Sequence, residues 1–301
     1  MERLRQHVLG LWGRWWFVPL IPTAHAGLMA ALGTLRPEHI LVAAGIAGLG
    51  FASRPTRLLV AAVFPALLVG LAYDLMRFVT PFFVRPGRVW GCEMRAIELS
   101  LFSVGPDTTL PDFFHLHNAP VFDLLFAIPY AGFIYIAALY ALYIFVRDRE
   151  RGYVYLWAFA ICHFIGFAIY MAVPAAPPWY IRAYGCVIDP TAAPSAAALL
   201  RVDQLLGLHY FEGFYSRNPN VFGAMPSLHC AFPALGLFSA WHAAGWRTRP
   251  IHLGYLAVMV LASVYLDHHW LIDGLVGIAV AGLAVMIATR LRRPFRAVAT
   301  A

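Results

Sequence analysis

The stretch Tyr265-Leu-Asp-His-His-Trp-Leu-Ile-Asp-Gly274 places four ionisable side chains between two apolar runs. The runs cover residues 251–267 and 270–289, and both are long enough for helices that cross a membrane. On a helix, His269 and Asp273 would share one face, where a carboxylate orients an imidazole and makes its free nitrogen a better nucleophile. The alternative is a polar collar on a helix end at the membrane surface.

The composition is that of an integral membrane protein. The 301 residues are 61% hydrophobic and only 12% charged, which is about half the charged fraction of a soluble domain. All 22 basic residues are arginines, and the net charge is +7. They lie at the ends of apolar runs and not in an aromatic-rich basic cluster, so we expect membrane lipids and no nucleic acid as partners. The four cysteines show no metal-binding spacing, and we expect no metal and no cofactor.

Apolar runs predict an all-α, polytopic membrane helix bundle with about eight spans. The first run contains two prolines and a histidine, so it either crosses the bilayer or lies on it, and we expect it to cross. The predicted spans are residues 17–33, 40–53, 58–76, 121–146, 154–173, 225–245, 251–267 and 270–289.

Two long segments between the spans mix charges, prolines and aromatics. Residues 77–120 are expected to lie outside the membrane with one interfacial helix at about 94–102, and residues 181–222 form a second outer segment. We therefore divide the chain into N-terminal spans with an outer interfacial segment, residues 1–120, and a catalytic transmembrane core, residues 121–301.

The arginines indicate the orientation of the spans. With eight spans, the short segments on one side hold 14 of the 22 arginines, and the side with the long segments holds eight. Short arginine-rich segments stay in the cytoplasm, so the long segments face the periplasm or the exterior of a bacterial inner membrane. Cys92 and Cys186 both fall in these outer segments, and we expect a disulfide between them. Three polar segments then meet at the outer surface: residues 174–180, 223–229 and 265–274.

Gly223-Ala-Met-Pro-Ser-Leu-His229 opens the sixth predicted span. Pro226 suits the first turn of a helix, where its missing N–H costs nothing. Free backbone N–H groups near Ser227 and Leu228, together with the Ser227 hydroxyl, would bind an anion at the positive end of the helix. His229 can reach a group bound there. The alternative is a helix start with an incidental histidine.

These motifs carry a resemblance to a known family. Pro226-Ser-Leu-His229 followed by His269-x-x-x-Asp273 resembles the second and third signature motifs of the type 2 phosphatidic acid phosphatase superfamily. The neighbourhoods look more like its inositol phosphotransferase branch, typified by inositol phosphorylceramide synthase. Pro174-Ala-Ala-Pro-Pro-Trp-Tyr180 is similar to a proline–tryptophan segment of that branch. The resemblance covers about residues 154–291 and implies a six-helix core.

The sequence departs from the phosphatase members of the superfamily. They carry a lysine in the first motif and a Ser-Arg pair before the third-motif histidine, whereas this chain has no lysine and has Ala262 and Ser263 there. The inositol-transferring branch also lacks that arginine. The cations for the phosphate stay open: Arg182 is the first candidate and Arg217 the second, and each is alternatively an arginine facing water or lipid head groups.

The resemblance implies transfer through a phosphohistidine. His269 would attack the phosphorus of a lipid phosphodiester, Asp273 would orient it, and His229 would protonate the leaving alcohol and then deprotonate the acceptor. Pro226, Ser227 and Leu228 would hold the phosphate oxygens.

Further residues are assigned more loosely. Pro178 and Trp179 are candidate substrate contacts, although aromatic residues also gather at membrane interfaces. His268 either donates to a phosphate oxygen or faces away from His269, and we favour the second. Asp267 is expected to be a surface residue.

Three functions remain open. The first is transfer of a phosphoinositol-like head group from a phosphatidylinositol-like donor to a lipid or glycan hydroxyl, such as that of a ceramide-like acceptor. The second is hydrolysis of a lipid or polyprenyl phosphate. The third is non-catalytic lipid binding or transport, which the His229–His269–Asp273 set disfavours.

Overall fold

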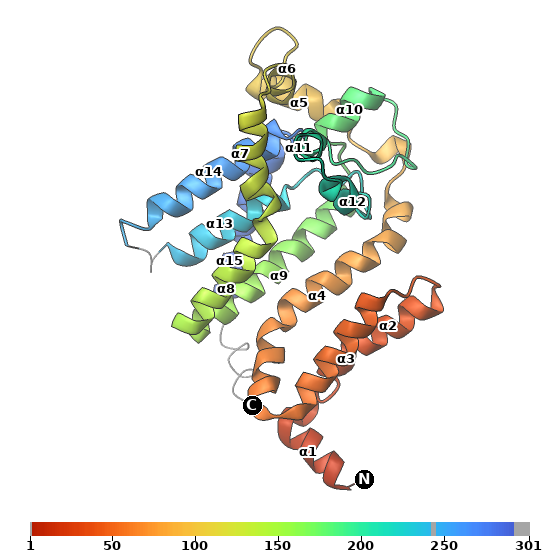
Figure 1. Cartoon of the computed structure of the whole chain (residues 1–301), viewed down its shortest axis with the longest axis vertical. Helices are drawn as coiled ribbons and strands as arrows, with labels where there is room; N and C mark the ends of the chain where they lie inside the picture. The colour runs from red at the N-terminus through yellow and green to blue at the C-terminus, as the bar shows by residue number, and fades with distance from the viewer. Residues whose placement is uncertain (1, 242–244, 292–301) are drawn as a thin grey trace. The chain divides into compact units, whose positions relative to one another are not determined.

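The computed structural model describes residues 2–241 and 245–291, and within them the chain is helical with no β-strand (Figure 1). The all-α prediction is confirmed. The first helices are α1 (Glu2–Trp12), α2 (Ile21–Ala31), α3 (Pro37–Ala52), α4 (Arg54–Phe83), α5 (Cys92–Phe102), α6 (Leu110–Leu116), α7 (Pro120–Ala131) and α8 (Phe133–Arg147). The others are α9 (Arg149–Ala172), α10 (Pro178–Tyr184), α11 (Leu199–Leu206), α12 (Tyr210–Tyr215), α13 (Leu228–Ala240), α14 (Arg249–Tyr265) and α15 (Leu271–Arg290).

The chain divides into two compact units. The first contains the residues up to Ala72 and those from Arg290 on, and the second runs from Tyr73 to Thr289. In the first unit, the indole of Trp12 donates to the Gly50 carbonyl at 2.8 Å. The predicted division at residue 120 stays a prediction.

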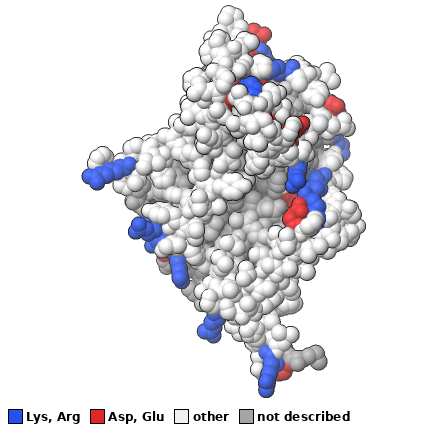
Figure 2. Space-filling view, in the orientation of Figure 1, with Lys and Arg blue, Asp and Glu red and all other residues white. Residues whose placement is uncertain are grey.

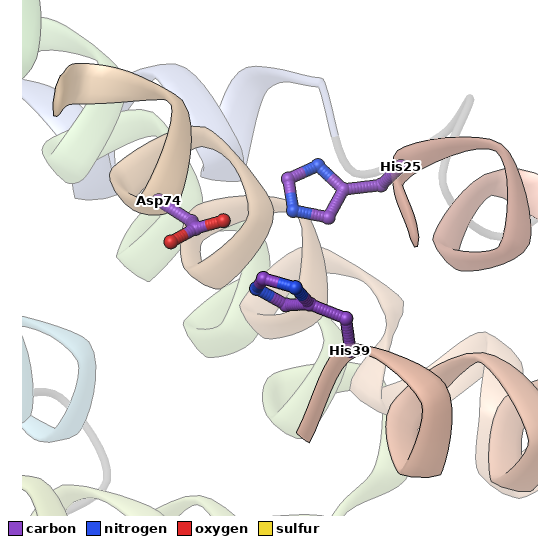
Figure 3. A group of neighbouring side chains, drawn as sticks. All are labelled: His25, His39 and Asp74. Carbon is purple, nitrogen blue, oxygen red and sulfur yellow. The ribbon is translucent and has the colours of Figure 1, made fainter. Parts of the chain in front are cut away.

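A histidine at the start of α3 closes its first turn within the first unit. The backbone N–H of Arg36 donates to Nδ1 of His39 at 3.1 Å. His25 of α2 lies edge-on to His39, with ring centroids 5.5 Å apart. Figure 3 draws both imidazoles, together with Asp74 from α4. The contact between the two rings joins α2 to α3.

The apolar helices coincide with the predicted spans. Three helices, α4, α9 and α15, are each long and apolar enough to cross a membrane, and α7 with α8 forms a bent pair that passes the same test. The other predicted spans correspond to shorter apolar helices: Val18–Ala31, α3, α13 and α14. The face drawn in Figure 2 is mostly uncharged, with charged side chains in small separate groups. The protein is therefore an integral membrane helix bundle, while the count of eight spans stays a prediction. Arg292, Arg293 and Arg296, which belong to the 14 arginines counted on the predicted cytoplasmic side, lie outside the described residues.

The sequence explains the bend between α7 and α8. Pro129 lies inside α7 and Gly132 separates α7 from α8, where the axis turns by 45°. Proline removes a helical hydrogen bond and its ring pushes against the preceding turn. The span between residues 120 and 147 therefore bends near its middle.

The segments of the second unit that are predicted to lie outside the membrane form short helices around one end of the longer ones (Figure 1). α5 confirms the predicted helix at residues 94–102, although its interfacial position is untested. Cys92 at its start forms a disulfide with Cys186, with the Cα atoms 5.3 Å apart, which confirms the predicted pair. The disulfide ties the segment before the core to the loop after α10.

Candidate active site

Two imidazoles from separate helices meet directly. Nδ1 of His229, in the first turn of α13, lies 3.2 Å from Nε2 of His269, which precedes α15. Both residues belong to the second unit, and His269 is only 6% exposed to solvent. The predicted meeting of the two rings is confirmed, while their catalytic roles stay predictions.

A backbone carbonyl decides which nitrogen of His269 is free. Nδ1 lies 2.9 Å from the carbonyl oxygen of Ala224. A carbonyl only accepts hydrogen bonds, so in the neutral ring Nδ1 carries the proton and Nε2 carries the lone pair. That lone pair points at His229. The ring is therefore held as the tautomer that a nucleophile at Nε2 requires.

Asp273 is more distant from His269 than the sequence suggested. Its Oδ2 lies 3.6 Å from Nδ1 of His269, which is beyond a good hydrogen bond. The sequence argument placed His269 and Asp273 on one face of a helix. That argument is wrong, because α15 begins at Leu271 and His269 lies before it. Ala224 is the nearer partner of Nδ1, and sequence reasoning missed it.

Asp273 joins the two motif segments. Its carboxylate accepts the N–H of Trp270 at 2.9 Å, which closes the first turn of α15, and its carbonyl accepts the N–H of Ser227 at 2.9 Å. Asp273 is fully buried. One turn later, a Cβ on Gly277 would overlap the carbonyl of Ser227. The glycine therefore lets the start of α13 rest on α15 at backbone distance.

α13 begins three residues after the start of the predicted span at residue 225. The helix begins at Leu228, and the Ser227 hydroxyl accepts the N–H of Cys230 at 3.3 Å as its N-cap. Pro226 therefore lies before the cap, and its predicted place in the first turn is wrong. The N–H groups of Leu228 and His229 have no partner within the helix, because they belong to its first turn. The predicted anion site used the N–H groups near Ser227 and Leu228, but the Ser227 N–H already donates to the Asp273 carbonyl. Anion binding by the Leu228 N–H and the Ser227 hydroxyl stays a prediction.

The proline–tryptophan segment, residues 174–180, holds the backbone that contacts His269. Its Ala175 donates to the carbonyl of Phe222 at 2.8 Å and accepts the N–H of Ala224 at 3.3 Å. Ala224 is the residue whose carbonyl holds His269. Pro178 is buried at the start of α10, and the N–H of Trp179 lies 3.3 Å from the carbonyl of Asp267. Direct substrate contact by Pro178 and Trp179 stays a prediction.

A buried glutamate caps the helix that carries Asp273. The Glu98 carboxylate on α5 accepts the N–H groups of Leu271 and Ile272, at 3.0 and 3.3 Å, and is fully buried. Burial raises the pKa of Glu98, and the two backbone hydrogen bonds oppose that shift. Sequence reasoning missed this residue. The available signal was its place four residues after Met94, on the apolar side of the predicted helix.

Aromatic rings enclose His229. The ring of Tyr130 stacks on it, with centroids 4.3 Å apart and planes 14° apart, and the Tyr130 hydroxyl lies 3.3 Å from Nδ1. Phe133 lies 4.4 Å from the same imidazole. Both residues flank the break between α7 and α8. The motif sequence around His229 contained no signal for either contact.

His268 is held apart from the reactive pair. Its Nε2 lies 3.1 Å from the carbonyl of Ala196, and its ring is stacked by Tyr215 at 4.6 Å and Tyr130 at 5.3 Å. These contacts favour the interpretation in which His268 faces away from His269 and does not donate to a phosphate oxygen.

Arg182 is engaged by two carboxylates. Its Nη2 donates to Asp267 Oδ1 at 2.7 Å, and its Nη1 donates to Asp112 Oδ1 at 3.0 Å. Asp267 is only 6% exposed, so its predicted surface position is wrong. Burial raises the pKa of Asp267, and the Arg182 charge opposes that rise. Arg217 is exposed. Phosphate binding by either arginine stays a prediction.

Comparisons with known proteins agree with the motifs and extend them. The sequence profile of the PAP2 superfamily matches residues 109–287, so the family region begins well before the predicted start at residue 154. No solved structure matches the chain.

Relatives with curated names match over longer stretches. A phosphoinositol dihydroceramide synthase of Bacteroides thetaiotaomicron is 34% identical over 259 residues, which cover 84% of each chain. The inositol phosphorylceramide synthase catalytic subunit of Schizosaccharomyces pombe is 28% identical over 77% of this chain and 54% of its own length. The chain therefore belongs to the PAP2 superfamily, and it is a membrane phosphotransferase.

Proposed function

We propose that the protein transfers phosphoinositol from a phosphatidylinositol-like donor to the hydroxyl of a ceramide-like lipid. The printed names of the relatives favour this substrate pair. The observation that carries the chemistry is the contact between His229 and His269, with the Nε2 lone pair of His269 directed at its partner.

The first half-reaction forms a bond between nitrogen and phosphorus. Nε2 of His269 attacks the phosphorus of the donor, and the bond from phosphorus to the diacylglycerol oxygen breaks. Protonated His229 gives its proton to that oxygen, so the alcohol leaves neutral. The Ala224 carbonyl accepts from Nδ1 throughout, and the nearby Asp273 carboxylate stabilises the positive charge on the ring.

The donor phosphate has to displace an existing contact. Nε2 of His269 is 3.2 Å from Nδ1 of His229, which leaves no room for a phosphate between them. When the phosphate enters, its oxygens can accept from the free N–H groups of Leu228 and His229 at the start of α13. The helix start then takes the place of the lysine that the phosphatase members carry.

The second half-reaction reverses the roles. His229 takes the proton from the acceptor hydroxyl, the acceptor oxygen attacks the phosphorus, and the bond to Nε2 breaks. A histidine acting as general acid and base contributes roughly 10²–10⁴ in rate. Exclusion of water from the intermediate would favour transfer over hydrolysis.

We place this reaction at the outer leaflet of a bacterial inner membrane. The arginine distribution supports that orientation, because 14 of the 22 arginines lie in the short segments on the opposite side. The variants Arg217→Cys and Arg149→Cys would test this orientation, if each new cysteine is labelled from one side of the membrane and then from the other.

The decisive experiment is lipid mass spectrometry on the purified protein with phosphatidylinositol and ceramide. We expect inositol phosphorylceramide and diacylglycerol in equal amounts, and about 10²–10⁴-fold less of both with His229→Ala. Release of free phosphate from phosphatidic acid without head-group exchange would instead identify a hydrolase. Exchange onto a glycan with no ceramide product would refute the lipid acceptor.

A further inference from the structure

A small apolar cavity opens beside the active site at the break between α7 and α8. Its volume is about 100 Å³. The break occurs at Gly132, where the span bends by 45°, as the chain around α7 and α8 shows in Figure 1. The cavity is lined by Tyr130, Ala131, Phe133, Ile134, Tyr135, Leu199, Tyr210, Phe211, Phe214 and Tyr215.

The lining is mostly hydrocarbon and aromatic ring, with hydroxyl groups on four tyrosines, and it has a buried floor and an exposed rim. Leu199 of α11 and Phe211 of α12 are buried, whereas Ile134 is 46% exposed and Phe214 is 48% exposed. The lining carries no charged residue. A mostly apolar lining with a few polar groups suits the part of a lipid where the hydrocarbon meets the head group. In a membrane, exposed apolar side chains on a span face the hydrocarbon of the lipids.

Two of the residues that line this cavity also contact His229, the proposed donor and acceptor of the alcohol proton. Tyr130 stacks on His229 at 4.3 Å, and Phe133 lies 4.4 Å from it. A group in the cavity is therefore separated from His229 by one aromatic ring. A lipid alcohol whose hydroxyl reaches His229 would bring its hydrocarbon chain against these two rings.

We propose that the cavity receives a hydrocarbon chain of the lipid alcohol, close to its hydroxyl. This rests on the proposed function, because it requires the alcohol to react at His229. The alcohol is the departing diacylglycerol or the attacking ceramide-like lipid, which share this chemistry. A volume of about 100 Å³ holds roughly three methylene groups, given that one water occupies about 30 Å³.

The test is photo-crosslinking with lipids that carry a diazirine in the chain near the head group. One arm uses a photoactivatable ceramide and the other a photoactivatable phosphatidylinositol, each with the full-length protein in vesicles. We expect label on residues 130–135 or 210–215, competed by the unlabelled lipid. The arm that labels them identifies which alcohol uses the cavity.

A matched pair of variants separates the cavity from the general lipid surface. Ile134→Trp narrows the rim, whereas Leu139→Trp adds the same bulk to an exposed position on α8 outside the lining. We expect Ile134→Trp to lower labelling and kcat/KM for the lipid about tenfold, since each buried methylene is worth about a fourfold factor. Leu139→Trp should stay within about twofold of the wild type.

Label confined to other residues, or equal losses in both variants, would overturn the cavity assignment. Competed labelling of the cavity without any inositol phosphorylceramide product would instead refute the proposed substrates and leave the lipid site standing.

Discussion

Two polar clusters lie next to each other in the second unit, joined by residues 267–269, and they are held together in different ways. The histidine cluster consists of His229, His269 and Asp273. Backbone carbonyls and N–H groups hold His269 and Asp273, and the rings of Tyr130 and Phe133 pack on His229. The arginine cluster consists of Arg182, Asp267 and Asp112, and opposite charges hold it.

This difference indicates which cluster performs chemistry. A backbone carbonyl on Nδ1 leaves Nε2 of His269 with a free lone pair. The guanidinium of Arg182 already donates to two carboxylates, so its charge is largely neutralised before any phosphate arrives. We infer that the histidine cluster reacts and that the arginine cluster positions the loop carrying His268 and His269.

The largest expected effect comes from removing the reactive nitrogen. His269→Ala should lower turnover more than about 10⁴-fold, because the nucleophile has no substitute, and His229→Ala should lower it by about 10²–10⁴-fold. Initial rates of head-group transfer measure both, with size-exclusion profiles as the folding control. Near-normal turnover in His269→Ala would refute the nucleophile assignment.

The next effect concerns the support beneath the histidine cluster. Glu98→Ala leaves the N–H groups of Leu271 and Ile272 buried without an acceptor, and it loosens the turn before Asp273. We expect kcat to fall about 10–100-fold with little change in KM, because small misplacements of reacting groups are costly.

Glu93→Ala is the matched control on the same helix, since the Glu93 carboxylate accepts the N–H of Gly91, in the loop before α5, and not those of α15. Equal kinetics in the two alanine variants would show that Glu98 does not position the site. Partial recovery of kcat in Glu98→Gln, which keeps one acceptor, would distinguish positioning from general loss of stability.

A smaller effect is expected for Arg182, and it tests the comparison directly. Arg182→Gln leaves Asp267 buried without its partner, and we expect kcat/KM to fall less than about tenfold. Adding Asp267→Asn should restore most of the loss, because the unpaired charge is gone. A double variant as poor as the single one, with a loss above about 100-fold, would instead make Arg182 a phosphate ligand.

The smallest effect is a pH dependence of stability. The pKa of Glu98 is raised in the folded protein, so its stabilising contribution is complete below the ordinary glutamate pKa of about 4.3 and is lost as the pH rises through the folded pKa. The unfolding temperature of the wild type, relative to Glu98→Gln, should therefore fall as the pH rises above about 4.3. A constant difference in detergent-solubilised protein would contradict this.

The comparison also shows how far sequence reasoning reached. The meeting of His229 with His269 and the Cys92–Cys186 disulfide both followed from counting spans, because that count decides which segments share a membrane face. The exposed position given to Asp267 was wrong, since its partner Arg182 lies 85 residues away in the sequence.

The sequence by itself determined the membrane class, the helical fold, the family and the identity of the motif histidines. These depend on hydropathy and on short motifs, which are local properties of the chain. Only the tertiary structure decided that Ala224 fixes the tautomer of His269, that Glu98 caps the helix of Asp273, and that Tyr130 lies between His229 and a cavity. Such contacts join backbone groups and side chains from distant segments, so they exist only after the helices have packed.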